Sequence, residues 1–105
     1  MNKMKRAKVY RNTAIGEIQL LCNLAREVDA DGRNVNVFRA RFSDIERIRD
    51  EFDKQHMIII DSLLQDEDAD LRLEETIREG FLADYYEIKS IHETLNSDGS
   101  INAPN

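Results

Sequence analysis

Residues that interrupt helices are scarce in this sequence of 105 residues. It has four glycines, no tryptophan and a single proline, Pro104, close to its C-terminal end. Long stretches without a helix breaker favour a few long helices and exclude a fold of many short strands joined by turns. The chain is not of the disordered class either, because 41% of its residues are hydrophobic and 34% are charged. We therefore expect an all-α fold.

Cysteine and long hydrophobic runs are also nearly absent. A single cysteine, Cys22, excludes an internal disulfide, and the longest apolar run covers only residues 57–60. A membrane-spanning helix needs about 20 apolar residues, and no apolar segment typical of a signal peptide follows the basic N-terminus. Asn2 stands where an N-myristoylation signal requires glycine. The expected location is the cytoplasm or nucleus, with no secretion, no membrane span and no membrane partner.

The charges are distributed unevenly along the chain. The net charge is -6, yet the first acidic residue is Glu17, and five cations precede it: Lys3, Lys5, Arg6, Lys8 and Arg11. This pattern predicts a basic N-terminal arm over residues 1–11, attached to an acidic body that disfavours nucleic acid across the domain. The five cations are candidates for phosphate contact, as the weaker of two functional hypotheses.

Apolar spacing predicts three helices at about residues 13–29, 36–65 and 70–95, with the start of the first one open by up to two turns. They form a domain over residues 12–95, followed by a flexible tail at 96–105. Short polar connections between them predict an antiparallel up-down-up bundle, a long helical hairpin with coiled-coil-like packing. The expected core residues are Ile18, Leu21, Phe38, Phe42, Ile45, Phe52, Ile59, Leu63, Ile77, Phe81 and Ile88.

No segment has the pattern of a metal or catalytic site. The stretch EVDADGRNVNVF, residues 27–38, resembles a calcium loop, but in either register position 12 is Ala40 or Phe38 and not a bidentate Glu. We interpret it as a helix end, a bend at Gly32 and a helix start. A zinc-binding helix would need a second histidine four residues after His92, where Asn96 stands. We expect no metal, no cofactor, no small-molecule ligand and no enzyme activity.

Apolar residues in the second half of the long predicted helix exceed one stripe. Residues 57–60, with Leu63 and Leu64, are apolar around most of the circumference, so this half needs neighbours on more than one side. Arg49 and His56 interrupt the apolar seam of that helix, either as polar residues that set the register of a helix interface or with the Arg49 stem lying along the apolar edge. The candidate interaction residues are Arg49, His56, Ile58, Ile60, Leu64, Tyr85 and Tyr86.

Three segments together resemble a known family. They are RFSDIERIRDEF at residues 41–52, the acidic break QDEDAD at 65–70 and FLADYYEI at 81–88. Their order is similar to that in the N-terminal helical region of the Gag-like polyprotein of BEL/Pao-type LTR retrotransposons of animals. The resemblance covers about residues 12–95. It implies a structural, non-enzymatic module in a retroelement, or in a domesticated host gene descended from one.

Two functional hypotheses follow from the sequence. The first is a helical protein-protein interaction and self-association module, whose partner is a second copy, most simply in a dimer, or a helix of another protein. The second is a nucleic-acid- or chromatin-associated factor, in which the basic arm contacts phosphates and the helices form the dimerisation unit.

Overall fold

The chain folds into four α-helices. A computed structural model describes the backbone of residues 2–102 and the side chains of residues 2–97. The helices are α1 (Lys3–Asp31), α2 (Val35–Phe42), α3 (Ile45–Leu63) and α4 (Arg72–Asn102), and this part of the chain contains no strand. None of its helices is long and apolar enough to cross a membrane. The all-α class is therefore confirmed, whereas the expected number of three helices is wrong.

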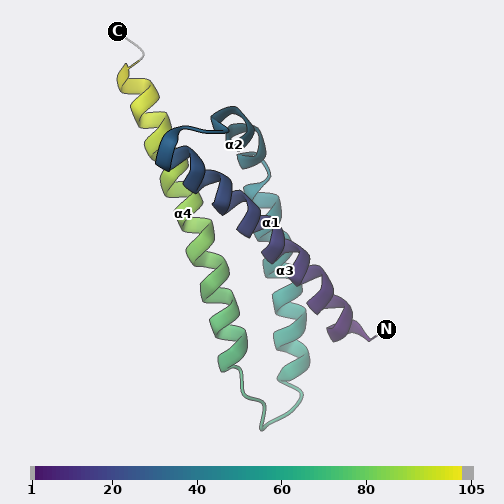
Figure 1. Cartoon of the computed structure of the whole chain (residues 1–105). Helices are drawn as coiled ribbons and strands as arrows, with labels where there is room; N and C mark the ends of the chain where they lie inside the picture. The colour runs from purple at the N-terminus through teal and green to yellow at the C-terminus, as the bar shows by residue number, and fades with distance from the viewer. Residues whose placement is uncertain (1, 103–105) are drawn as a thin grey trace.

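The extra helix arises because the predicted long helix at 36–65 is broken at Ser43 and Asp44. The Ser43 hydroxyl donates to the Ala40 carbonyl at 2.8 Å, and the Asp44 amide bonds the Arg41 carbonyl at 3.0 Å in a tighter turn. Serine and aspartate bond nearby backbone groups readily and so compete with the helical ladder. The break turns α2 away from the axis of α3 (Figure 1).

The helix ends also differ from the predicted ones. α1 begins at Lys3, where the Asn2 side chain accepts a hydrogen bond from the Lys5 amide at 2.7 Å. Residues 3–11 are thus part of a helix and not a separate arm. At the other end α4 continues to Asn102, so residues 96–102 of the predicted tail are helical, and residues 103–105 lie outside the described ones.

The bend after α1 is a helix end, as the interpretation of residues 27–38 requires. Gly32 is left-handed with φ 77°, and its amide bonds the Val28 carbonyl at 2.9 Å. The Asp31 carboxylate accepts from the backbone and side chain of Arg33, which lowers the pKa of Asp31. Asn34, with φ 61°, precedes α2.

Replacing Gly32 and Gly80 with alanine should change the free energy of unfolding in opposite directions, although both glycines have open surroundings. Gly32→Ala should lower the free energy of unfolding by about 1 kcal/mol or more, because an L side chain disfavours the left-handed region. Gly80→Ala, inside α4, should raise it by about 0.5–1 kcal/mol through helix propensity. A Cβ atom would have no neighbour within 4 Å at either position. Urea unfolding of both variants checks the pair, and equal effects would contradict the backbone assignment.

The long helices are arranged unequally around the core. α1 crosses over both α3 and α4, which run in opposite directions from the loop that joins them (Figure 1). α1 packs extensively against α3 and α4, whereas α3 and α4 contact each other much less. The molecule is elongated, with extents of 61 × 23 × 19 Å. One side of each helix in the α3–α4 pair therefore depends on α1 for cover.

The core follows the apolar stripes. Most of the expected core residues are buried, namely Ile18, Leu21, Phe38, Ile45, Phe52, Ile59, Phe81 and Ile88. Phe42, Leu63 and Ile77 are only partly buried. The rings of Phe52 and Phe81 stack with centroids 4.1 Å apart, and this pair joins α3 to α4.

Candidate functional site

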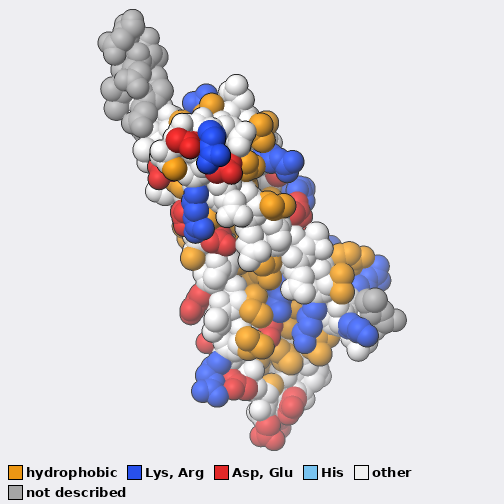
Figure 2. All heavy atoms as spheres, in the orientation of Figure 1, with side chains coloured by type: hydrophobic (Ala, Val, Ile, Leu, Met, Phe, Trp, Pro, Cys, Tyr) orange, Lys and Arg blue, Asp and Glu red, His pale blue; other side chains and the backbone are white. Residues whose placement is uncertain are grey.

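The apolar residues around the α3–α4 loop are the first candidate site. On α3, Met57 and Leu64 are exposed, while Ile58 and Ile60 are half-buried. Leu73, in the first turn of α4, has an exposed fraction of 66%. We call Met57, Leu64 and Leu73, with the half-buried Ile58 and Ile60, the loop-end surface. Figure 2 shows hydrophobic side chains over the lower half of this face of the molecule.

The reason that these side chains stay exposed is the packing around α3. Residues 57–60 are apolar on most sides, but α1 is the only helix among the described residues that packs extensively on α3. A helix that is apolar all round needs cover from more than one direction. Among the described residues, the second neighbour predicted from the sequence makes only limited contact with α3.

Two of the other predicted interaction residues are used inside the chain. The Arg49 guanidinium lies over the Tyr85 ring, 4.6 Å from its centroid, and Tyr85 is buried. The Tyr85 hydroxyl donates to the Glu46 carboxylate at 2.9 Å, and Lys89 reaches the same carboxylate at 3.2 Å. These contacts, the hydroxyl first, lower the pKa of Glu46. Of Arg49, Tyr85 and Tyr86, only Tyr86 is exposed.

A buried polar network joins the three long helices. Arg11 of α1 donates from Nη1 to Glu74 Oε1 of α4 at 2.7 Å, and the same Nη1 lies 3.0 Å from Nδ1 of His56 on α3. All three side chains are buried, and Arg11 has an exposed fraction of 3%. The His56 ring also stacks on Phe52, with centroids 5.3 Å apart. One guanidinium thus ties α1 to both helices of the α3–α4 pair.

The expectation of phosphate contact is wrong for Arg11, because its charge is buried against Glu74. Lys3, Lys5, Arg6 and Lys8 are exposed and stay candidates. Sequence reasoning missed Arg11 and Glu74 as buried residues. A signal was present for Arg11, because it continues the buried stripe of Ala7, Ala14 and Ile18 at helical spacing.

The network makes stability depend on pH. Burial, followed by the charge of Arg11, lowers the pKa of His56; Glu74 and Asp53 act in the opposite direction, and Arg78 adds to the lowering. The unfolded chain therefore binds a proton more readily than the folded one, so the free energy of unfolding should fall as the pH drops below about 6.5. Burial also lowers the pKa of His92, whose ring stacks on Phe42 with centroids 3.5 Å apart, so this residue should likewise reduce stability at lower pH.

Urea unfolding at about pH 8 and about pH 5.5 measures this effect, since carboxylates with lowered pKa act only at more acidic pH. The His56→Gln variant should show a smaller difference between the two pH values than the unchanged chain. An equal difference in both proteins would mean that His56 carries none of the effect.

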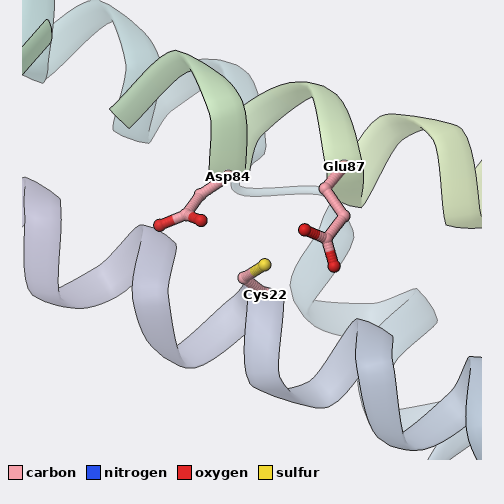
Figure 3. Close-up of side chains that lie close together, drawn as sticks. All are labelled: Cys22, Asp84 and Glu87. Atoms are coloured by element: carbon pink, nitrogen blue, oxygen red, sulfur yellow. The ribbon is translucent and has the colours of Figure 1, made fainter. Parts of the chain in front are cut away.

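A second cluster lies between α1 and α4. The Cys22 thiol points toward the carboxylates of Asp84 and Glu87 (Figure 3), with the possible ligand atoms of the three side chains all within 4.8 Å of one another. Burial and then the two negative charges raise the pKa of Cys22 to about 11. Arg26 holds Glu87 by two hydrogen bonds of 2.6 and 2.9 Å. The thiol is therefore protonated at neutral pH and is a poor nucleophile.

As a metal site the cluster has clear disadvantages. A metal ion would require the thiolate form of Cys22 and would compete with Arg26 for Glu87. Glu87 is instead bound by Arg26 in an ion pair on the edge of the α1–α4 interface, and Cys22 is buried in that interface. We therefore infer that these three side chains are part of the packing between α1 and α4.

Comparison with known proteins adds no relative. No protein-family model matches the chain, and no curated protein or solved structure matches it significantly. The resemblance to the retrotransposon Gag region remains a prediction from residues 41–88, and the function has to be argued from the geometry.

Proposed function

We propose that this chain is a non-enzymatic helical module that associates with itself, with the loop-end surface as its interface. One observation carries the proposal: the apolar half of α3 and the start of α4 leave Met57, Leu64 and Leu73 exposed around a loop of acidic residues. Several large apolar side chains exposed at one end of a molecule support an interface there. A second helix pair laid against this end would cover α3 from a further side.

The Gag-like resemblance implies the same kind of module, whether in a retroelement or in a host gene descended from one. Coiled-coil-like packing between copies is part of the proposal, because Met57, Ile60 and Leu64 follow one another at spacings of three and four residues at the C-terminal end of α3. The partner proposed first is a second copy, and a helix of another protein is the runner-up.

Light scattering of the purified chain at about 100 μM tests the proposal. We expect a molar mass near twice the 12.2 kDa of one chain. A strict monomer at this concentration would remove the proposal. Replacing Leu64 and Leu73 with serine should lower the measured mass to that of one chain, because the exposed leucines would no longer be buried between copies.

Leu20→Ser is a matched control for this experiment. Leu20 is as exposed as the two leucines, at 64%, but it lines a hollow at the junction of α1, α2 and α3, formed with Glu17, Arg41 and Ile48. Its replacement should leave the mass unchanged. A drop in mass with Leu20→Ser would place the interface elsewhere.

The alternative is a nucleic-acid-associated factor. It is favoured by the four exposed cations on the first two turns of α1, with the Arg6 guanidinium 5.8 Å from the Tyr10 ring centroid. Fluorescence anisotropy with a labelled duplex or RNA at about 50 mM salt tests it, because phosphate contacts are strongest at low salt. Absence of binding under these conditions would exclude this function.

A further inference from the structure

Two surfaces of opposite charge lie at the same end of the molecule. The basic segment consists of Lys3, Lys5, Arg6 and Lys8 on the first turns of α1, next to the exposed Val9 and Tyr10. The acidic turn consists of Asp66, Glu67, Asp68 and Asp70 between α3 and α4. Figure 2 shows red side chains at the lowest point of the molecule and blue ones on the side of the N-terminus.

Most of these charges have no ion-pair partner among the side chains of residues 2–97. Among the ion pairs of the described residues, the only one that involves either surface joins Asp70 to Arg72 at 2.7 Å. Asp66 accepts a hydrogen bond from the Asp68 amide at 2.9 Å, which leaves its charge in place. Four cations and three carboxylates thus face solvent at one end of the molecule.

A hollow separates the two surfaces. It has a volume of about 260 Å³ and is lined by Lys3 of α1 and by Ile58, Asp61, Ser62 and Gln65 at the end of α3. The first turn of α1 therefore faces the last turns of α3, with the basic segment on one side of the hollow and the acidic turn beyond the other. Ile58 of the loop-end surface is part of its wall.

We infer that the partner at this end is a second copy of the chain in a reciprocal, twofold arrangement. In it the basic segment of each copy pairs with the acidic turn of the other, and Leu64 and Leu73 are buried between them. A twofold interface repeats every contact, so one complementary pair of surfaces acts twice. This inference rests on the proposed self-association and specifies its geometry.

Charge favours a second copy over a polyanion as the occupant. A nucleic acid approaching the basic segment would meet the acidic turn of the same chain and a net charge of -6. A second copy, in contrast, offers an acidic turn to the basic segment and receives the same in return. Complementary patches of this kind set the register of an interface and speed its formation.

Charge reversal tests the arrangement. Replacing Lys3, Lys5 and Lys8 with glutamate makes the basic segment acidic, and replacing Asp66, Glu67 and Asp68 with lysine makes the acidic turn basic. Each triple variant alone should bind itself at least about tenfold more weakly than the unchanged chain, because like charges then face each other at both contacts. Mixed in equal amounts, the two variants should form a heterodimer, since opposite charges meet again at both contacts.

Sedimentation equilibrium with one variant labelled measures the three affinities. Arg39→Glu with Arg41→Glu is the control, because it reverses two exposed cations on α2, at the opposite end of the molecule (Figure 1), and should leave association unchanged. Circular dichroism confirms that each variant is folded. Glutamates at the start of α1 also suit the positive end of the helix dipole.

The outcomes separate this inference from the proposed function. A monomeric unchanged chain overturns both. Association that neither triple variant weakens, or that mixing does not restore, overturns only the reciprocal arrangement and leaves self-association through apolar contacts. Association of the unchanged chain should also weaken when salt is raised from about 50 mM to about 500 mM, because screening reduces exposed charge pairs.

Discussion

Replacing Glu74 with alanine lowers the free energy of unfolding by about 3–5 kcal/mol, because it leaves the guanidinium of Arg11 buried without a counter-charge. Arg11 donates to Glu74 at 2.7 Å, and its Nε atom already lacks a hydrogen-bond partner among the described residues. Little compensation is available, since the neighbouring His56 offers the guanidinium a ring nitrogen but no negative charge. Urea unfolding at neutral pH measures the loss.

Two variants show whether the buried charge is the cause. Glu75→Ala removes the adjacent, exposed carboxylate and should change the free energy of unfolding by less than about 0.5 kcal/mol. Replacing Arg11 and Glu74 together with methionine and leucine should recover most of the loss, because a well-packed apolar pair needs no counter-charge. Equal losses for Glu74→Ala and Glu75→Ala would mean that Arg11 is solvated in solution.

Replacing Phe52 with alanine should destabilise the fold by a similar amount, about 3–5 kcal/mol, through lost burial and the cavity that remains. Phe52 is fully buried on α3, and its ring lies between Phe81 of α4 and His56. This stack is an apolar link between α3 and α4, beside the polar contacts of Tyr85 and Lys89 with Glu46. The variant should lose much of the 5–15 kcal/mol that stabilises a domain of this size.

Met57→Ala is the control on the same helix. Met57 is exposed, so its truncation should cost less than about 0.5 kcal/mol in the monomeric state at low concentration. Phe52→Leu keeps most of the apolar volume and remains measurable if the alanine variant does not fold. A loss below about 1 kcal/mol for Phe52→Ala would contradict the position of its ring in the core.

The helices and most of the core could be predicted because their signals are local. Ile18, Phe52, Ile59 and Ile88 recur at helical spacing on their own segments, and each is fully buried. The bend at Gly32 was also readable, because glycine tolerates the left-handed conformation that ends a helix. The apolar stripes and the helix end at Gly32 depend only on residues within about two helical turns along the chain.

The break at Ser43 and Asp44 was not predicted. The apolar seam continues across it from Phe38 and Phe42 to Ile45 and Phe52, so spacing alone favours one helix. The local hydrogen bonds of Ser43 and the tight turn at Asp44 compete with that pattern, and packing of α2 against α1 favours the turned arrangement. The balance between them depends on packing against α1, which the apolar spacing of residues 36–65 does not report.

The candidate site, like the fold, could be predicted only in part from the sequence. The apolar excess at residues 57–64 and the opposite charges of residues 3–8 and 66–70 are visible in the sequence. Their position at one end of the molecule is not, because it depends on the direction in which α1 crosses α3. The burial of Arg11 against Glu74, which lie 63 residues apart, depends on the same crossing.

The sequence by itself thus determined the all-α class, the apolar faces and the bend after α1, since these depend on the spacing and backbone preferences of neighbouring residues. Only the tertiary structure decided which charged groups are internal and which apolar ones stay exposed. The reason is physical: a side chain is buried by the helices that pack over it, and here α3 and α4 cover Arg11 of α1, whereas Leu64 and Leu73 stay in solvent.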